Sequence, residues 1–419
     1  MKKNTILALL SVMVLSVSAQ AEIITHQMHI WKDGISTDFV VESEIDSITF
    51  SETVYSTDTT LQTPDGDTTK LWPAQAGGKW GYINARGNFV IVPLFQNAIG
   101  FSCGYALVSM DNEIKFIDKN GIFQATPFTF DGDSNASSFY YNYSTIEIDR
   151  SYGLMNNKFQ VTIQPYFSAL YEMGDNGLVV AKRDGSSKYE YVNAKGETQI
   201  SAMYEGADSF KDGVAVVVLI SKYGAIDKSG NMIIQPTYQY GLENMGEGLI
   251  AFGDKNGKRG ILDKKGNMIQ AALYKDLGFV YDGLILCSSK GEKYGYLDTK
   301  GAIVIPEMYY RAYPFFEGYA WVKQSDEGDG AWMSIDKKNS VVFYLAKGEY
   351  PMTGFHNGLA LVATEDGYKY VNEKGNMVYS WIFDDPGWAP KKAQCKQMSF
   401  RERMEEFTNM TLNLDTRKL

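Results

Sequence analysis

Histidines and carboxylates are the residues that could carry out catalysis in this chain, and neither type forms a recognisable catalytic pattern. The sequence holds three histidines, His26, His29 and His356. His26 and His29 are three positions apart in an expected strand, where their side chains point to opposite faces and do not share a metal ion. No G-x-S-x-G nucleophile motif accompanies His356. The 50 acidic residues offer many carboxylate pairs for glycoside hydrolysis, but context singles out none of them.

Metal and cofactor motifs are incomplete. Residues 131–135 (Asp-Gly-Asp-Ser-Asn) begin like an EF-hand loop, but its sixth and twelfth positions are Ala136 and Asn142 instead of glycine and glutamate. We favour a polar loop, with a weak calcium site as the alternative. Neither a P-loop nor a G-x-G-x-x-G motif occurs. We therefore expect a chain that is not an enzyme, with no catalytic residue, no metal and no cofactor.

An aromatic insert at residues 138–143 is the most unusual local feature. It reads Ser-Phe-Tyr-Tyr-Asn-Tyr. Exposed aromatic rings stack on sugar rings or anchor partner proteins. The alternative is that the run forms an irregular strand of the surrounding structure. The candidate ligand-binding residues are Phe139, Tyr140, Tyr141 and Tyr143.

A repeated β-structure must position these residues, and this repeat is the strongest signal in the sequence. A turn of the form Asp/Asn-x-x-Gly recurs along the chain, with degenerate copies at Asn156 and Asp336. The steps from Asn84 to Asn372 are 34 to 38 residues long and average 36. Asp or Asn bonds its own backbone two residues on, and the glycine accepts positive φ, as in a hairpin closed by a bulge. The complete copies are 84–87, 118–121, 193–196, 227–230, 263–266, 298–301 and 372–375.

Each repeat unit predicts three short strands. An aromatic-glycine strand such as Trp80–Ile83 precedes the turn, and an apolar strand such as Phe89–Pro93 follows it, often ending in proline. An aromatic-rich connection then leads to a glycine and a third strand, as in Gly104–Val108. So small a unit does not bury both of its faces, and neighbouring units must share a core. We predict an all-β tandem array of about nine three-stranded antiparallel repeats, either closed like a propeller or open as a superhelix.

The unit resembles the WG repeat, also called the KWG repeat. Residues 78–88 carry the resemblance most fully, and residues 222–231 and 293–298 carry it with tyrosine in place of tryptophan. The similarity extends over roughly residues 77–380. The resemblance implies a β-rich bacterial repeat in which binding or scaffolding is suspected, with no shared enzymatic activity. It supplies no functional residues to carry over.

Composition and charge narrow the classes of partner. The chain is 44% hydrophobic and 14% aromatic, which is typical of a folded protein and not of a disordered one. A formal net charge of −10 without a basic cluster makes nucleic acid and anionic membrane surfaces poor partners. Cys103, Cys287 and Cys395 are odd in number, so a disulfide would leave one over, and their pairing stays open.

The two ends of the chain differ from the repeats. Lys2 and Lys3, the apolar run 6–17 and Ala-Gln-Ala at 19–21 predict a signal peptide over 1–21, and therefore an exported protein, periplasmic or at the cell surface. The apolar run is too short to span a membrane. Residues 22–50 alternate like short strands and are similar to the module that follows the signal in many exported Bacteroidetes proteins. We predict a linker over 51–72, the array over 73–390, and a helical cap over 391–419, with a mobile tail as the alternative.

Together these features predict a non-enzymatic binding or scaffold protein of the cell envelope. It would recognise a protein or glycan partner through the repeat surface. The first alternative is a structural envelope component without a specific ligand. The second is a glycan-active hydrolase.

Overall fold

The computed structural model describes residues 26–32, 35–41, 70–132, 134–325 and 330–382. The chain divides into two units, Met1–Gln62 and Thr63–Leu419. In the first unit, β1 (His26–Lys32) pairs antiparallel with β2 (Ile35–Val41). The predicted signal peptide and C-terminal cap lie outside the described residues, as does most of the predicted linker. No helix in the described ranges is long and apolar enough to cross a membrane.

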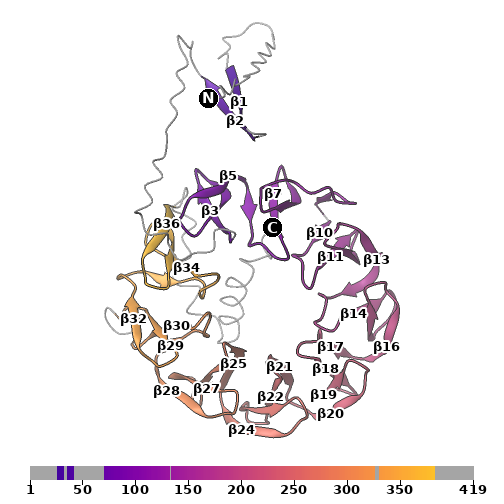
Figure 1. Cartoon of the computed structure of the whole chain (residues 1–419). Helices are drawn as coiled ribbons and strands as arrows, with labels where there is room; N and C mark the ends of the chain where they lie inside the picture. The colour runs from indigo at the N-terminus through magenta and orange to yellow at the C-terminus, as the bar shows by residue number, and fades with distance from the viewer. Residues whose placement is uncertain (1–25, 33–34, 42–69, 133, 326–329, 383–419) are drawn as a thin grey trace, which may run out of the picture. The chain divides into compact units, whose positions relative to one another are not determined.

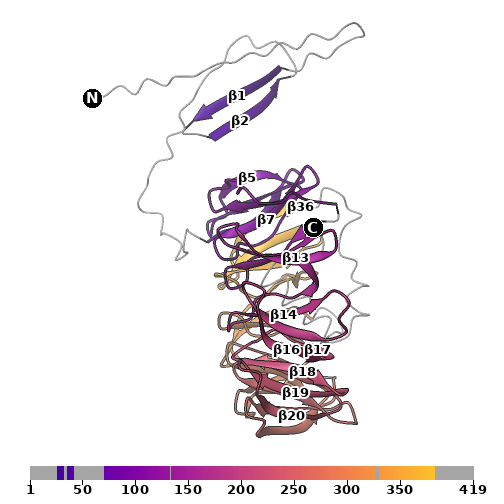
Figure 2. The ribbon, with the colours of Figure 1, turned by 90° about the vertical axis from the view of Figure 1, so that its right-hand side faces the viewer.

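The second unit is a series of small antiparallel sheets in chain order (Figures 1 and 2). The long strand β13 (Val161–Leu170) pairs with β12 and with β14, so the seven-stranded sheet joins two repeats. Counting it as two gives nine repeats over residues 70–382, in agreement with the turn spacing.

The strands of the first three repeats are, for repeat 1, β3 (Trp72–Ala76), β4 (Lys79–Ile83) and β5 (Phe89–Phe95); for repeat 2, β6 (Asn97–Ala98), β7 (Tyr105–Met110), β8 (Glu113–Asp118) and β9 (Phe130–Asp131); and for repeat 3, β10 (Asn135–Ala136), β11 (Tyr143–Ile148), β12 (Ser151–Asn156) and the start of β13. The middle three repeats contain, for repeat 4, the end of β13, β14 (Leu178–Arg183), β15 (Tyr189–Asn193) and β16 (Thr198–Tyr204); for repeat 5, β17 (Gly206–Ala207), β18 (Val214–Leu219), β19 (Lys222–Asp227) and β20 (Met232–Tyr238); and for repeat 6, β21 (Leu242–Gly246), β22 (Leu249–Gly253), β23 (Arg259–Asp263) and β24 (Met268–Tyr274). The last three repeats contain, for repeat 7, β25 (Asp276–Tyr281), β26 (Leu284–Ser288), β27 (Tyr294–Asp298) and β28 (Ile303–Tyr309); for repeat 8, β29 (Arg311–Ala312), β30 (Tyr319–Lys323), β31 (Met333–Asp336) and β32 (Val341–Tyr344); and for repeat 9, β33 (Tyr350–Pro351), β34 (Leu359–Ala363), β35 (Gly367–Asn372) and β36 (Met377–Ile382).

The all-β tandem array is confirmed, but most repeats have one strand more than the three that the sequence predicts. A leading strand, often only two residues long, pairs with the second strand, as β17 pairs with β18. Two residues are too few to show a periodic pattern, which is why the sequence does not reveal this strand. The sequence unit is also out of phase with the sheets. It begins in the third strand of one sheet and ends in the second strand of the next.

The predicted Asp/Asn turn joins the last two strands in all nine described repeats. At Asp118 the backbone carbonyl accepts the N–H of Gly121 at 2.9 Å, and Oδ1 accepts the N–H groups of Asn120 and Ile122 at 2.9 and 3.0 Å. The same side-chain bonds to the backbone recur in the other repeats. In the two degenerate copies Phe159 and Asn339 replace the glycine at positive φ, 60° and 65°. Side-chain capping therefore preserves the turn without the glycine.

The glycine of the aromatic-glycine pair lies opposite a β-bulge. Tyr294 pairs with Tyr309 and Tyr296 pairs with Ile305, so the single residue Gly295 faces three residues of β28. A Cβ atom on Gly295 would lie 2.5 Å from the Ile305 carbonyl oxygen. Pro306 lies inside this bulge, in the middle of the strand. Pro306 therefore does not end the strand, but it lies on the edge strand of its sheet, where proline is expected. The bulge already interrupts the ladder, so the missing N–H removes no pairing bond.

The core of the second unit is divided among the repeats. Of the nine buried clusters within residues 70–382, eight join successive repeats. The ninth packs Trp72 and Ile83 of repeat 1 with Leu361 and Trp381 of repeat 9. We call this contact between the first and the last sheet the terminal junction.

The terminal junction replaces a missing strand with side-chain hydroxyls. In repeat 5, backbone N–H groups next to the leading strand bond to the carbonyls of Val216 and Val218 on β18. Repeat 1 has no leading strand among the described residues. Its equivalent carbonyls, those of Pro73 and Gln75, instead accept the hydroxyls of Tyr370 and Tyr379 from repeat 9, at 2.9 and 3.1 Å. Proline at position 73 has no N–H to leave unpaired at this edge.

Candidate functional site

The aromatic insert is split between the core and the surface. Phe139 is 1% exposed and packs against Phe116 and Phe159, with ring centroids 5.1 and 5.7 Å apart. Its ring is therefore part of the core shared by repeats 2 and 3 and is not available to a ligand at the surface. Tyr143 is partly buried and packs against the buried cluster shared by repeats 3 and 4. The predicted ligand-binding residues therefore do not form one aromatic surface.

Tyr141 is the exposed member of the insert. Tyr140 and Tyr143 exchange backbone hydrogen bonds of 2.7 and 2.9 Å, which close a two-residue turn at Tyr141 and Asn142. Both turn residues have positive φ, 47° and 67°, and the Tyr141 side chain is 58% exposed. This is the turn between the leading and second strands of repeat 3, so the insert occupies a regular position in the repeat.

Equivalent turns in the other repeats form what we call the turn series. A non-glycine residue with φ between 47° and 55° occupies the tip in seven of the described repeats, and glycine or asparagine follows it. In repeat 4 the turn contains Asp175 and reaches positive φ at Gly177 instead. The residues of the turn series are Cys103, Tyr141, Asp175, Asp212, Glu247, Asp282, Glu317 and Asn357.

Five carboxylates of the turn series link successive repeats, from repeat 4 to repeat 9. Glu317 is the fullest case: its two oxygens accept the backbone N–H groups of Asn357 and Gly358, at 2.7 and 2.8 Å. Sequence reasoning missed this role, although the signal was visible as an acidic residue directly before the glycine that opens the second strand. The other linking pairs are Asp175 with the Gly213 N–H, Asp212 with that of Gly248, Glu247 with that of Gly283, and Asp282 with that of Gly318.

The environment of Tyr141 is acidic. Burial raises the pKa of its phenol, and the charges of Asp175 and Asp212 raise it further. The phenol therefore stays protonated at neutral pH and is available as a hydrogen-bond donor. An aromatic ring with a hydroxyl beside carboxylates can stack on an apolar surface and bond to hydroxyl or amine groups.

A pocket of about 680 Å³ lies beside the turn series in repeats 5 to 7. It contains both signs of charge, because Lys264 and Lys265 line it together with two linking carboxylates. Both of those carboxylates already bond to backbone N–H groups. Its lining residues are Asp212, Glu247, Gly248, Leu249, Asp263, Lys264, Lys265, Asn267 and Thr299.

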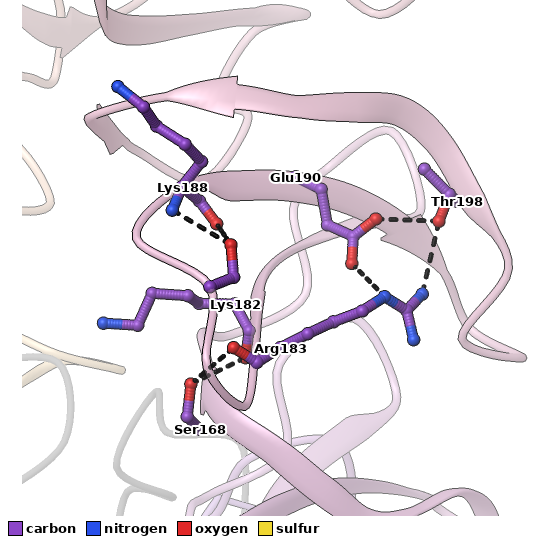
Figure 3. A network of polar contacts seen from close by, with 7 residues as sticks. Ser168, Lys182, Arg183, Lys188, Glu190 and Thr198 are labelled. Atoms are coloured by element: carbon purple, nitrogen blue, oxygen red, sulfur yellow. Dashed lines mark hydrogen bonds and ion pairs between the residues drawn. The ribbon is translucent and has the colours of Figure 1, made fainter.

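The most buried carboxylate of the described repeats has a structural environment. Glu190 occupies the glycine position of the aromatic-glycine pair in repeat 4 and is 3% exposed. Its carboxylate contacts Arg183 Nε at 2.6 Å and accepts the Thr198 hydroxyl at 2.7 Å (Figure 3). The Arg183 guanidinium also donates to Thr198 and lies 5.1 Å from the centre of the Phe167 ring. The carboxylate is thus neutralised within the sheet and does not face a ligand.

The remaining chemistry-bearing residues are dispersed. His356 lies at the terminal junction, where its carbonyl accepts the Trp72 indole N–H at 2.9 Å. Cys103 and Cys287 are both free thiols, and burial raises the pKa of Cys287 to about 12. Cys395 and Asp133 of the acidic loop lie outside the described residues. Within the described ranges no group of three or more His, Cys, Asp or Glu side chains is arranged to hold a metal ion.

The chain is distantly similar to several solved structures. The dihydro-heme d1 dehydrogenase NirN, in complex with DHE, aligns with a TM-score of 0.40 at 12% identity, over 76% of this chain and 74% of that one. A quinonprotein alcohol dehydrogenase-like protein of Bacteroides thetaiotaomicron aligns with a TM-score of 0.32 at 8% identity, over 86% of this chain and 82% of that one. Hsv2 of Kluyveromyces lactis aligns at 0.33 and 7%, over 68% and 97%. No curated protein matches the sequence.

A protein-family comparison identifies the repeat itself. The family described as WG containing repeat matches residues 80–113, 152–186, 191–220, 223–258 and 294–327. All five stretches begin in the strand that precedes the Asp/Asn turn, which is where the sequence unit begins. The chain therefore carries WG repeats at these five positions.

Proposed function

We propose that this chain is an exported, non-enzymatic binding protein that recognises a protein or glycan partner through the turn series of its repeats. The observation that carries the proposal is the contrast within that series. Five of its carboxylates bond to the neighbouring repeat, whereas Tyr141 leaves its ring 58% exposed beside two of them. The backbone turn is kept from repeat to repeat while the residue at its tip varies, and this combination suits a recognition surface.

The binding proposal includes two further parts. The array closes through the terminal junction, which is supported by the shared core and by the Tyr370 and Tyr379 hydroxyl bonds. Export is supported by the basic start, the apolar run and the Ala-Gln-Ala site of residues 1–21. Fractionation of cells that make the full chain tests export: the processed protein should leave the cytoplasm.

Binding is tested with the chain from Glu22 onward, immobilised and exposed to an envelope extract and to a glycan array. Tyr141→Ala should reduce capture of whatever the wild type retains. Tyr240→Ala is the matched control, because Tyr240 is similarly exposed, at 55%, but lies outside the turn series. Absence of any captured ligand, or equal loss with both variants, would count against the proposal and favour a structural envelope role.

A further inference from the structure

The turn series and the Asp/Asn turns lie at the same end of the sheets. In a four-stranded antiparallel sheet the first and third hairpin turns close one end, and the second turn closes the other. Contacts agree: the Asn157 N–H donates to the Asn142 carbonyl at 2.9 Å, and Lys337 Nζ donates to the Asp282 carbonyl at 2.6 Å. We call this end the turn face. In Figure 1 the leading strands β21 and β25 lie inside β24 and β28, so the turn series forms its inner row and the Asp/Asn turns its outer row.

A basic residue occurs in every Asp/Asn turn, at its second or third position, and all of these side chains are exposed. The nine turns contain eleven basic and six acidic residues, so their net charge is +5 in a chain whose formal charge is −10. The turns are about 36 residues apart along the chain, and therefore their basic residues form no cluster in the sequence. We call them the outer basic row.

The turn does not need these basic side chains. It uses the backbone N–H groups of Arg86, Lys158 and Lys195, which any residue except proline supplies. These three turns begin with asparagine, so they contain no aspartate for a base to neutralise. None of the three side chains forms an ion pair with a residue that the structure describes. Exposed cations that recur without a role in the fold favour an anionic partner.

Beside Lys158 the inner row supplies a different chemistry. The Asn157 side chain donates to Asn142 Oδ1 at 3.0 Å, which ties the Lys158 turn to the turn that carries the exposed Tyr141 ring. The neighbouring Asp175 carboxylate accepts one backbone N–H, at 3.2 Å, and has capacity for further donors. An aromatic ring that stacks, a carboxylate that accepts hydroxyls and an ammonium group that pairs with an acid match the groups of an acidic sugar.

We propose that the turn face of repeats 1 to 4 binds an anionic glycan, a polymer of sugars that carry carboxylate or sulfate groups. This inference rests on the proposed function and names its class of ligand. The acid groups pair with the outer basic row, the hydroxyls bond to the inner row, and one sugar stacks on Tyr141. Nucleic acid fits less well, because its dense phosphates meet the inner carboxylates and it offers them few hydroxyl donors.

Binding of the chain from Glu22 onward to two matched pairs of polymers tests the ligand class. Polygalacturonate and dextran sulfate should bind, whereas methyl-esterified polygalacturonate and dextran, which lack the charges, should bind more weakly. Lys158→Gln/Lys195→Gln should raise the dissociation constant for the charged polymers about three- to tenfold. Lys255→Gln/Lys290→Gln is the control, since it removes the same charge from exposed lysines in turns at the opposite end of the sheets and should leave binding unchanged.

Circular dichroism and thermal unfolding confirm that each variant is folded before its binding is compared. The proposal is overturned if neither charged polymer binds better than its uncharged counterpart, or if the control pair weakens binding equally. Single-stranded DNA that binds as tightly as both polymers also overturns it, because charge alone would then explain the binding. If the glycan proposal fails but Tyr141→Ala still reduces capture of a protein or a neutral glycan, the proposed function stands. If the wild type captures nothing, both fail.

Discussion

Single glycines in the aromatic-glycine pairs decide whether a sheet can form its bulge. We expect Gly295→Ala to destabilise the protein by about 1–3 kcal/mol, because its Cβ would meet backbone atoms of Ile305, Pro306 and Glu307 that have no flexible end to move. Urea unfolding measures the change. Gly100→Ala is the control, since a Cβ on Gly100 meets nothing within 4 Å. Equal stability losses for both variants would contradict the packing explanation.

The turn aspartates make stability depend on pH. Hydrogen bonds from the Asn267 side chain, then from the backbone of Asn267 and Lys265, lower the pKa of Asp263. A carboxyl group whose pKa is lower in the folded state stabilises the fold above its unfolded pKa of about 3.9, and this stabilisation is lost as pH falls through the folded value. Asp263→Asn keeps the acceptor and removes the titration, as Asn84 and Asn193 do in their own repeats.

The expected result for Asp263→Asn is a shallower loss of stability in acid with little change at neutral pH. Urea midpoints measured from about pH 6 down to about pH 3 give the comparison. Asp263→Ala, which removes the acceptor as well, should be destabilised at every pH. Parallel pH profiles for wild type and Asp263→Asn would show that this carboxylate does not contribute.

At the scale of the element, the carboxylates of the turn series hold successive repeats together. We expect Glu317→Ala to cost about 1–2 kcal/mol, because the N–H groups of Asn357 and Gly358 lose their acceptor but remain near water. Glu317→Gln keeps one acceptor oxygen and should lie between wild type and alanine. Hydrogen exchange of the two amides identifies the lost bonds directly. Unchanged protection at both positions would argue against the link.

The sequence predicts the elements that have local chemical causes and misses those that depend on neighbours. The Asp/Asn turns are found because each needs only its own side chain and a residue at positive φ. The leading strands are missed because two residues such as Gly206 and Ala207 are defined only by pairing with β18. Pro306 lies on an edge strand, as proline should, but inside that strand instead of at its end, because a bulge opposite Gly295 is not visible from spacing alone.

The candidate surface is only partly predictable for the same reason. The insert was identified, but nothing in its sequence separates the buried Phe139 from the exposed Tyr141. That difference comes from Phe116 and Phe159, which are remote in the sequence and enclose one ring and not the other. Likewise, the acidic residues of the turn series gain their role only when the next repeat presents its backbone N–H groups to them.

At the scale of the whole second unit, the terminal junction resembles the internal junctions in its chemistry but joins segments far apart in the sequence. Buried tyrosines of the third strand donate to the next repeat at internal junctions, as Tyr296 does to the Tyr313 carbonyl at 2.7 Å. Tyr370 makes the corresponding bond across the terminal junction, to the carbonyl of Pro73, 297 positions away. An internal junction is maintained by chain continuity, whereas the terminal junction depends on these contacts.

Two matched substitutions therefore test whether the array closes in solution. Tyr296→Phe removes the hydroxyl bond to the Tyr313 carbonyl and should cost about 1–3 kcal/mol. If the first and last sheets stay packed together, Tyr370→Phe should cost a similar amount, since both side chains are at most 2% exposed. If the ends separate in solution, water reaches the Pro73 carbonyl and Tyr370→Phe becomes nearly neutral while Tyr296→Phe remains destabilising. Urea unfolding of both variants thus distinguishes a closed array from an open one, because the chemical change is the same and only the junction differs.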